Sequence, residues 1–127
     1  MGRSSTGKPD QDEIWLSIAR DFSRTPGGRY RNQGDFSGEE FREIVLIPRF
    51  EQAAGENKTL VVDLDGGYGY ASSFLEEAFG GLVRSKELQL SKAKAIALVQ
   101  RVVRFVSAEE PYLIRDIERY IREACDR

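Results

Sequence analysis

The stretch from Thr59 to Val83 limits what this chain can fold into more than any other part of the sequence. Leu60 to Leu64 is a short, almost continuous apolar run, which is typical of a strand covered on both faces. Asp65 and the glycines at positions 66, 67 and 69 end that strand, because these residue types favour turns. Apolar residues then recur at helical spacing from position 74 to position 83. The unit therefore predicts a strand, a glycine-bearing turn and an amphipathic helix.

A pair of serines stands where this predicted helix begins. Ser73 followed by Glu76 is a capping-box pattern, which predicts the helix start. Ser72 or Ser73 could instead be a phosphorylation site or a partner contact, since a phosphoryl group adds roughly −1.5 to −2 charge beside the oriented helix amides. Plain capping is the simpler explanation, because serine is among the preferred capping residues. The residues alone leave both interpretations open.

Strand and helix patterns alternate along the rest of the chain. Residues 14–18 and 102–106 predict further strands, and residues 29–31 a short additional one. Serines at positions 37 and 91 predict helix starts, as does the acidic stretch before Pro111. We expect the helix after position 37 to kink or break near Ile47, because Pro48 removes a backbone donor.

These alternating elements predict the α/β fold class. We expect one small domain over residues 13–127, with a mixed, mainly parallel sheet of about four strands and helices packed against it. Residues 1–12 are polar and small, and we expect them to be a disordered lead-in. In open α/β sheets, ligands and partners usually bind at the edge formed by the carboxyl ends of the strands.

The composition narrows the chemistry. The formal net charge of −2 over 127 residues gives no global attraction to nucleic acid or to anionic membrane. No apolar run is long enough to span a membrane, and the N-terminus lacks a signal-peptide core, so we expect a cytoplasmic protein. The chain has no histidine and a single cysteine, Cys125, which excludes Ser-His-Asp and Cys-His catalysis and an internal disulfide. We expect no metal, no cofactor and no enzymatic activity.

Three further groups of residues have weaker functional interpretations. Gly66 to Gly69 resemble a phosphate-binding loop only loosely, because the Lys-Ser/Thr ending is missing, and turn chemistry explains them better. Asp63 and Asp65 could share a strand face and hold Mg²⁺, but we expect Asp65 to shape the turn and Asp63 to meet an arginine. Arg29 and Arg31, beside a Pro-Gly-Gly turn, are candidates for binding a phosphate or an acidic patch, and a solvated loop is an equal alternative.

Several motifs together resemble a known family. They are Val61-Val-Asp-Leu-Asp65, Ala71-Ser-Ser-Phe-Leu-Glu-Glu-Ala-Phe-Gly-Gly-Leu82, Asp21-Phe-Ser-Arg-Thr-Pro-Gly-Gly-Arg-Tyr30, Ser37-Gly-Glu-Glu-Phe-Arg42 and Phe105-Val-Ser-Ala-Glu-Glu-Pro-Tyr-Leu-Ile114. The chain resembles the bacterial and phage STAS-like family of small uncharacterised domains, which is related to the STAS anti-sigma-factor antagonists. In those antagonists an Asp-Ser-Ser-Gly-Leu motif begins the helix, and a GHKL-type kinase phosphorylates its first serine. Ser72 falls on that serine and Ser73 on the next, while Ala71 replaces the aspartate and Phe74 the glycine.

The resemblance implies a non-enzymatic regulatory module that binds a GHKL-type ATPase or an anti-sigma-like protein. Phosphorylation of Ser72 would switch this binding, and the contact surface would contain Tyr68, Tyr70, Ser72, Phe74 and Glu77. Core packing is the alternative for the aromatic residues, above all for Phe74. One alternative is a small nucleotide- or phosphate-binding domain that uses the turn from Gly66 to Ser73. The other is a structural subunit, such as a homodimer, in which the serines only cap the helix.

Overall fold

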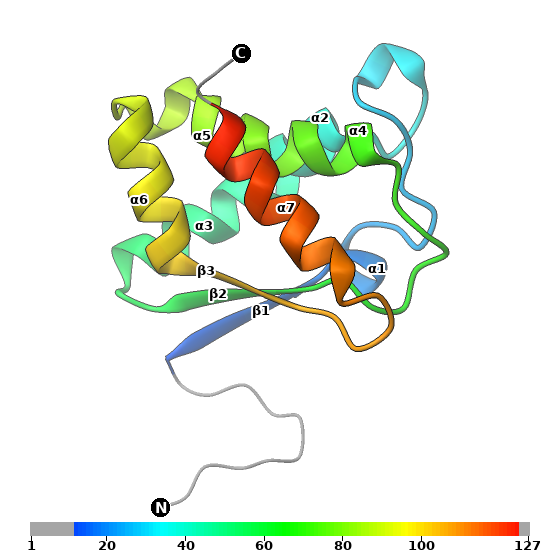
Figure 1. The fold of residues 1–127 in the computed structure, drawn as a ribbon, viewed down its shortest axis with the longest axis horizontal. Coiled ribbons are helices and arrows are strands. Elements are labelled where there is room, and N and C mark those ends of the chain that lie inside the picture. The colour runs from blue at the N-terminus through cyan, green and yellow to red at the C-terminus, as the bar shows by residue number, and fades with distance from the viewer. Residues whose placement is uncertain (1–11, 125–127) are drawn as a thin grey trace, which may run out of the picture.

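A three-stranded parallel sheet lies at one side of the protein, and the structure, a computed structural model, describes residues 12–124 (Figure 1). The strands are β1 (Glu13–Ser17), β2 (Thr59–Asp63) and β3 (Val103–Val106), in the spatial order β1-β2-β3. The α/β class and the parallel pairing are confirmed, and each of these three strands lies within one residue of its predicted bounds.

The expectation of about four strands is wrong by one, because residues 29–31 do not form a strand. The segment bends, and residues Arg31–Gln33 form the 3₁₀ turn η1. Gln33 causes this: its side-chain oxygen Oε1 accepts hydrogen bonds from the backbone N–H groups of Arg29 (3.1 Å) and Tyr30 (2.9 Å). A side chain that captures nearby backbone donors competes with strand pairing.

The helices lie on the same side of the sheet in Figure 1. Their bounds are α1 Ile18–Asp21, α2 Gly38–Phe41, η2 Arg42–Leu46, α3 Ile47–Gly55, α4 Ser72–Leu75, η3 Glu76–Gly80, α5 Gly81–Arg84, η4 Lys86–Leu88, α6 Lys92–Val102 and α7 Tyr112–Glu123. Two of the predicted helix starts are confirmed, because Ser37 Oγ accepts from Glu40 N–H (3.0 Å) and Ser91 Oγ accepts from Lys94 N–H (3.3 Å).

Two long helices each contain a π-helical turn. Residues 38–55 are helical throughout, with the π turn η2 in the middle, and residues 72–84 are helical throughout, with the π turn η3 in the middle. The predicted break near Ile47 is therefore replaced by the π turn that immediately precedes it. Pro48, the second residue of α3, directly follows this π turn, so the missing N–H group coincides with the point where the regular helical hydrogen-bond pattern changes.

The inner face of the sheet holds the hydrophobic core between strands and helices. The core includes Leu16, Leu60, Val62, Leu64, Phe41, Phe50, Phe74, Phe79, Leu82, Val99, Ile117 and Ile121. Phe74 connects α4 to α2, with its ring centroid 5.7 Å from that of Phe41. This packing fixes the helix that begins at Ser72 against the helix that begins at Gly38.

None of the described helices covers the outer face of the sheet in Figure 1. A hydrogen-bonded layer of side chains from Glu13, Trp15 and Arg104 covers it instead. Val61 on this face is fully buried, and its register neighbours are Trp15 on β1 and Arg104 on β3. The Glu13 carboxylate accepts from Trp15 Nε1 (3.1 Å) and from Arg104 Nη2 (2.7 Å), so it bridges the two neighbours across β2. The apolar run of β2 is thus covered on both faces, as predicted. The helices cover the inner face, and hydrogen-bonded side chains of the neighbouring strands cover the outer one.

The predicted lead-in and the single cysteine fall mostly outside the described part of the chain. Residues 1–11 and Cys125 lie beyond it, and Asp12 at its start is exposed. The sequence between these ends forms the sheet and helices described above.

Candidate functional site

The loop after β2 is a tight turn held by contacts with two other loops. Gly66 (φ 95°) and Gly69 (φ 133°) adopt backbone conformations that favour glycine. The N–H of Gly66 donates to Glu109 Oε1 (3.0 Å), and the N–H of Tyr68 donates to the carbonyl of Arg24 (2.8 Å). Turn chemistry therefore explains these glycines, as the sequence indicated.

Asp65 ties this loop to the loop after β3. Its carboxylate accepts from the Ser107 hydroxyl (2.9 Å) and from the backbone N–H groups of Ala108 (2.8 Å) and Glu109 (3.1 Å). Burial opposes its ionisation, but these three hydrogen bonds outweigh that effect and lower the pKa of Asp65. Asp63 accepts from the N–H of Asp65 (2.9 Å), so it supports the same turn, and the described residues place no arginine against it.

The two tyrosines of this loop differ in environment. The Tyr70 hydroxyl donates to the carbonyl of Leu64 (2.8 Å), and its ring packs 6.0 Å from that of Phe74. Burial and the nearby carboxylates raise the pKa of Tyr70. Tyr68 is 83% exposed, the most exposed of the large apolar or aromatic side chains in the described residues. Of the two, Tyr68 is the side chain exposed to solvent.

Neither serine caps the helix. Ala71 is the N-cap residue, Ser72 is the exposed first residue of α4 and Ser73 the half-buried second residue. The predicted capping box is therefore wrong, because Glu76 does not reach back to the helix start. Glu76 instead accepts from two arginines, in hydrogen bonds in which the donor as well as the acceptor is charged.

Two of the predicted contact residues are buried. Phe74 is fully buried in the core, and Glu77 is 7% exposed. Of the predicted contact residues, only Tyr68 and Ser72 are exposed, and Tyr70 is partly exposed. Phe74 holds the helix in place, and its side chain does not reach the surface.

Glu76 is the centre of a buried ion-pair network that the sequence did not predict. It is 7% exposed and accepts from Arg29 Nη1 (2.5 Å), Arg84 Nη1 (2.7 Å) and Arg84 Nη2 (3.3 Å). Burial works against the charge of Arg29, but the hydrogen bond and charge of Glu76, with Glu77 nearby, raise the pKa of Arg29. The network clamps the 29–33 segment onto the helix that begins at Ser72.

Glu77 completes the network with a third arginine. Arg42 from the other long helix donates through Nη1 to the Glu77 carboxylate and to the Glu77 carbonyl (3.0 Å). Gly81 leaves room for this guanidinium, since a Cβ at that position would lie 2.4 Å from Arg42 Nη1. The network thus joins the two π-containing helices, and its partners are far apart in sequence.

The two arginines predicted to bind an anion together are separated in the structure. Arg31 pairs with Glu43 at the exposed surface, whereas Arg29 belongs to the buried network. Arg29 lines a pocket of about 450 Å³ that does not include Arg31. The residues around that pocket are Arg29, Tyr30, Arg42, Glu77, Gly81, Arg84, Ser85, Lys86 and Glu87.

Tyr112 follows β3 as Tyr68 follows β2, at the carboxyl edge of the parallel sheet, but it was not identified from the sequence. It is 58% exposed, begins α7 directly after the loop that Asp65 binds, and its hydroxyl donates to Glu110 (2.8 Å). Its position after a predicted strand and Pro111 was a usable signal, because loops at the carboxyl ends of parallel strands meet at one edge. We call Tyr68, Ser72 and Tyr112 the tyrosine edge.

Within residues 12–124, no group of three or more carboxylate, histidine or cysteine side chains is arranged to hold a metal ion. None of the helices in this range is both long and apolar enough to cross a membrane.

Residues 37–96 match the family model described as a STAS-like domain of unknown function (DUF4325). The match contains the two π-containing helices, β2 and the start of α6, and it ends before β3. No curated protein and no solved structure matches the chain at the significance required. The resemblance inferred from the motifs is therefore confirmed for this segment: over residues 37–96 the chain is similar to the STAS-like domains of unknown function.

Proposed function

We propose that this protein is a non-enzymatic regulatory module that binds a protein partner through the tyrosine edge. The observation that carries the proposal is the 83% exposure of Tyr68 on a loop fixed by Asp65 and by the carbonyl of Arg24. A large aromatic side chain presented on a rigid loop loses little conformational entropy on binding, and aromatic residues often dominate interfaces. The similarity of residues 37–96 to STAS-like domains supports an interaction role.

The partner in this proposal is a GHKL-type ATPase or an anti-sigma-like regulator, and phosphorylation of Ser72 switches the contact. Ser72 supports the switch because it is exposed and does not act as the helix cap. The tyrosine edge is bordered by Asp65, Glu109 and Glu110, so a phosphoryl group there increases the negative charge of the surface. Added charge of about −2 disfavours a contact formed with a neutral serine, through desolvation and repulsion.

The test is a pull-down from the native host with tagged wild-type protein, followed by mass spectrometry and by calorimetry with the purified partner. Tyr68→Ala and Ser72→Asp should each weaken binding at least about tenfold, the loss expected of an interface anchor. Ser72→Ala and the matched surface variant Ile44→Ala, which alters a side chain that is 56% exposed elsewhere, should bind like wild type. Equal affinity of wild type, Tyr68→Ala and Ser72→Asp for the captured partner would refute the proposal.

A second candidate function is the binding of a phosphate-bearing small molecule, favoured by the pocket of about 450 Å³. Arg29, Arg42, Arg84 and Lys86 surround it with Glu77 and Glu87, and arginine forks suit phosphate oxygens. Titration with inorganic phosphate should then stabilise the protein against heat, and Lys86→Gln should reduce that effect more than Lys94→Gln, which removes an exposed lysine of α6. Equal stabilisation of both variants would exclude a site in this pocket.

A further inference from the structure

The two edges of the sheet differ, and the edge formed by β1 is closed. Thr59 N–H donates to the carbonyl of Asp12 (2.8 Å), so alternate residues of β1 face β2, and Trp15 and Ser17 point their backbone groups outward. Arg49 Nη1 donates to the outward carbonyl of Trp15 (3.4 Å). The carboxylate of Asp21 accepts from the outward N–H of Ser17 (2.9 Å). Side chains therefore occupy the positions that an added strand would need.

The opposite edge, formed by β3, is open. Leu64 N–H donates to the carbonyl of Val106 (3.0 Å), so Val106 and Arg104 face β2, and Val103 and Phe105 point their backbone groups outward. The N–H of Val103 donates a hydrogen bond to the carbonyl of Val99 near the end of α6. Among the described residues, the carbonyl of Val103 and both backbone groups of Phe105 have no protein partner. Folded proteins usually block or cover such groups, as this one does at β1.

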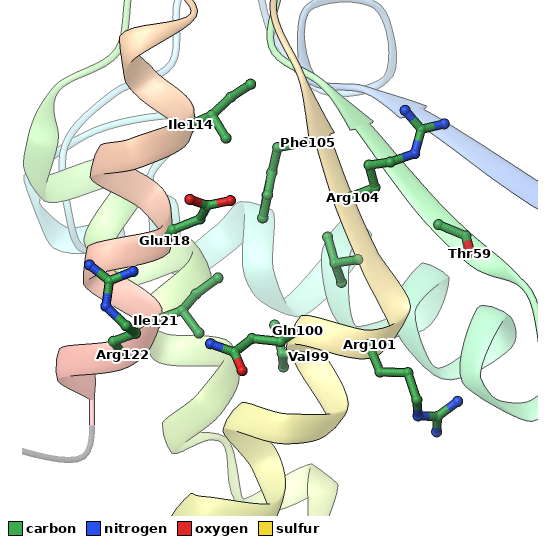
Figure 2. A pocket seen from close by; sticks show the side chains of 11 residues that line it. Thr59, Val99, Gln100, Arg101, Arg104, Phe105, Ile114, Glu118, Ile121 and Arg122 are labelled. Atoms are coloured by element: carbon green, nitrogen blue, oxygen red, sulfur yellow. The ribbon is translucent and has the colours of Figure 1, made fainter.

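A groove runs along this open edge. The last helix α7 packs mainly against the π turn η3 and leaves a space of about 610 Å³ beside β3. Figure 2 shows Phe105, Ile114 and Ile121 pointing into the space between β3 and α7. On the other side of β3 in the same view lie Arg101 and Arg104. The groove therefore has apolar side chains on its inner side, next to Gln100, Glu118 and Arg122, and basic side chains beyond β3.

We infer that the open edge of β3 binds an extended segment of a partner protein in which apolar residues alternate with aspartate or glutamate. The segment adds a fourth strand to the sheet by bonding to Val103 and Phe105. Side chains of a strand alternate between faces, so its inward residues contact Phe105 and Ile114 while its outward residues lie beside Arg101 and Arg104. This strand-binding groove is a different surface from the tyrosine edge, and the inference does not depend on that proposal.

The charge of the groove selects an acidic partner and disfavours a second copy of this chain. Arg101, Arg104 and Arg122 line the groove with Glu118 as the one carboxylate among the lining residues. The ion pair with Glu13 offsets part of the positive charge of Arg104, whereas Arg101 has no ion-pair partner within residues 12–124. Pairing two copies of β3 across a two-fold axis would bring these arginines together, and like charges on facing strands are destabilising. An acidic segment instead complements them.

The inference is tested with ¹⁵N-labelled protein and a synthetic blocked peptide of eight residues, Glu-Val-Asp-Val-Glu-Val-Asp-Val. The peptide should produce saturable shifts of the backbone amides of residues 103–106 and should slow hydrogen exchange of the Phe105 amide. Arg101→Glu should weaken binding about fivefold, the effect of reversing one exposed charge pair. The matched variant Arg115→Glu, which changes an exposed arginine of α7 outside the groove, should bind within about twofold of wild type.

Two N-methylated peptides distinguish strand addition from loose adsorption. One peptide carries N-methyl groups on the backbone nitrogens of its acidic residues, and the other on those of its valines. In a strand paired with β3 in one register, only every second residue directs its N–H group toward β3, so only one of these two sets of donors is used. One of the two peptides should therefore lose binding and the other should keep it. Absence of saturable binding, equal behaviour of the two methylated peptides, or equal binding of a Lys-Val repeat would overturn the inference. Concentration-dependent dimerisation with protection of Phe105 in the absence of peptide would assign the edge to a second copy and would also overturn it.

Discussion

Replacing Gly38 by alanine tests how the helix that begins at Ser72 is positioned. A Cβ added at Gly38 would lie 2.5 Å from the backbone oxygen of Phe74 and 3.2 Å from the Cβ of Glu77. Both obstacles belong to the facing helix, and the nearer is backbone, so a side-chain rotation cannot relieve the contact. The two long helices must move apart, although Phe41 and Phe74 pack between them.

Two effects of opposite sign decide the size of the change. Alanine is favoured over glycine inside a helix by about 1 kcal/mol, so at Gly38, the first residue of α2, the substitution stabilises the variant by at most that amount. Overpacking of a tightly packed contact costs about 1–3 kcal/mol, and a backbone obstacle places Gly38 toward the upper end. We expect the free energy of unfolding of Gly38→Ala to fall by about 1–2 kcal/mol, and its Tm to fall by several degrees for a domain of this size.

Gly55→Ala is the matched control. Gly55 is the last residue of α3, its φ is not positive, and an added Cβ meets nothing within 4 Å. The same substitution there should raise the free energy of unfolding by about 0.4–1 kcal/mol. Urea denaturation followed by circular dichroism measures both variants at pH 7. Stabilisation of Gly38→Ala, or equal effects at the two sites, would refute the argument that close helix contact requires glycine at position 38.

Three further perturbations examine single interactions. Glu76→Gln should lower the free energy of unfolding by about 3 kcal/mol, because two arginines lose their carboxylate partner. The control Glu51→Gln, at an exposed position, should change it by less than about 0.5 kcal/mol. Equal losses in the two variants would contradict a stabilising role of the ion-pair network. The pKa of Asp65 is lowered by folding, so its contribution is present above the unfolded value of about 3.9 and is lost as the pH falls through the folded value. Asp65→Asn should therefore reduce the acid sensitivity of urea denaturation, and an unchanged pH profile would count against this. The pKa of Tyr70 is raised, so stability is complete below the unfolded value of about 10 and falls as the pH rises above it; Tyr70→Phe should abolish this alkaline loss, and a loss equal to that of wild type would refute the assignment.

Local patterns predicted the elements whose causes are local. The apolar runs of β2 and β3 identified the strands, and the parallel pairing followed from the helices between them. Ser37 and Ser91 identified two helix starts, because a capping hydrogen bond spans only three residues. The turn at Gly66 was predictable for the same reason, since a positive φ is a property of one residue.

The errors arose where distant residues compete for a group. Ser73 and Glu76 fit a capping box, but Glu76 is taken by Arg29, which lies 47 residues away in sequence. Phe74 was predicted to be a contact anchor because aromatic residues often dominate interfaces, yet it lies on the apolar stripe of the helix and packs against α2. No pattern within a short window contains Arg29, so its pairing with Glu76 could not be deduced before the helices were placed, whereas the apolar stripe already favoured burial of Phe74.

The side-chain layer of Glu13, Trp15 and Arg104 on the outer face of the sheet contains a natural fluorescent reporter, Trp15. Trp15 is the only tryptophan in the chain, and its indole N–H is bonded to Glu13 rather than buried among core side chains. The other oxygen of Glu13 holds Arg104, whose side chain lines the groove beside β3. Intrinsic fluorescence excited at the tryptophan band therefore senses events at Arg104 through a single shared carboxylate. A chain bound along β3 that draws Arg104 away would alter the emission without any added dye.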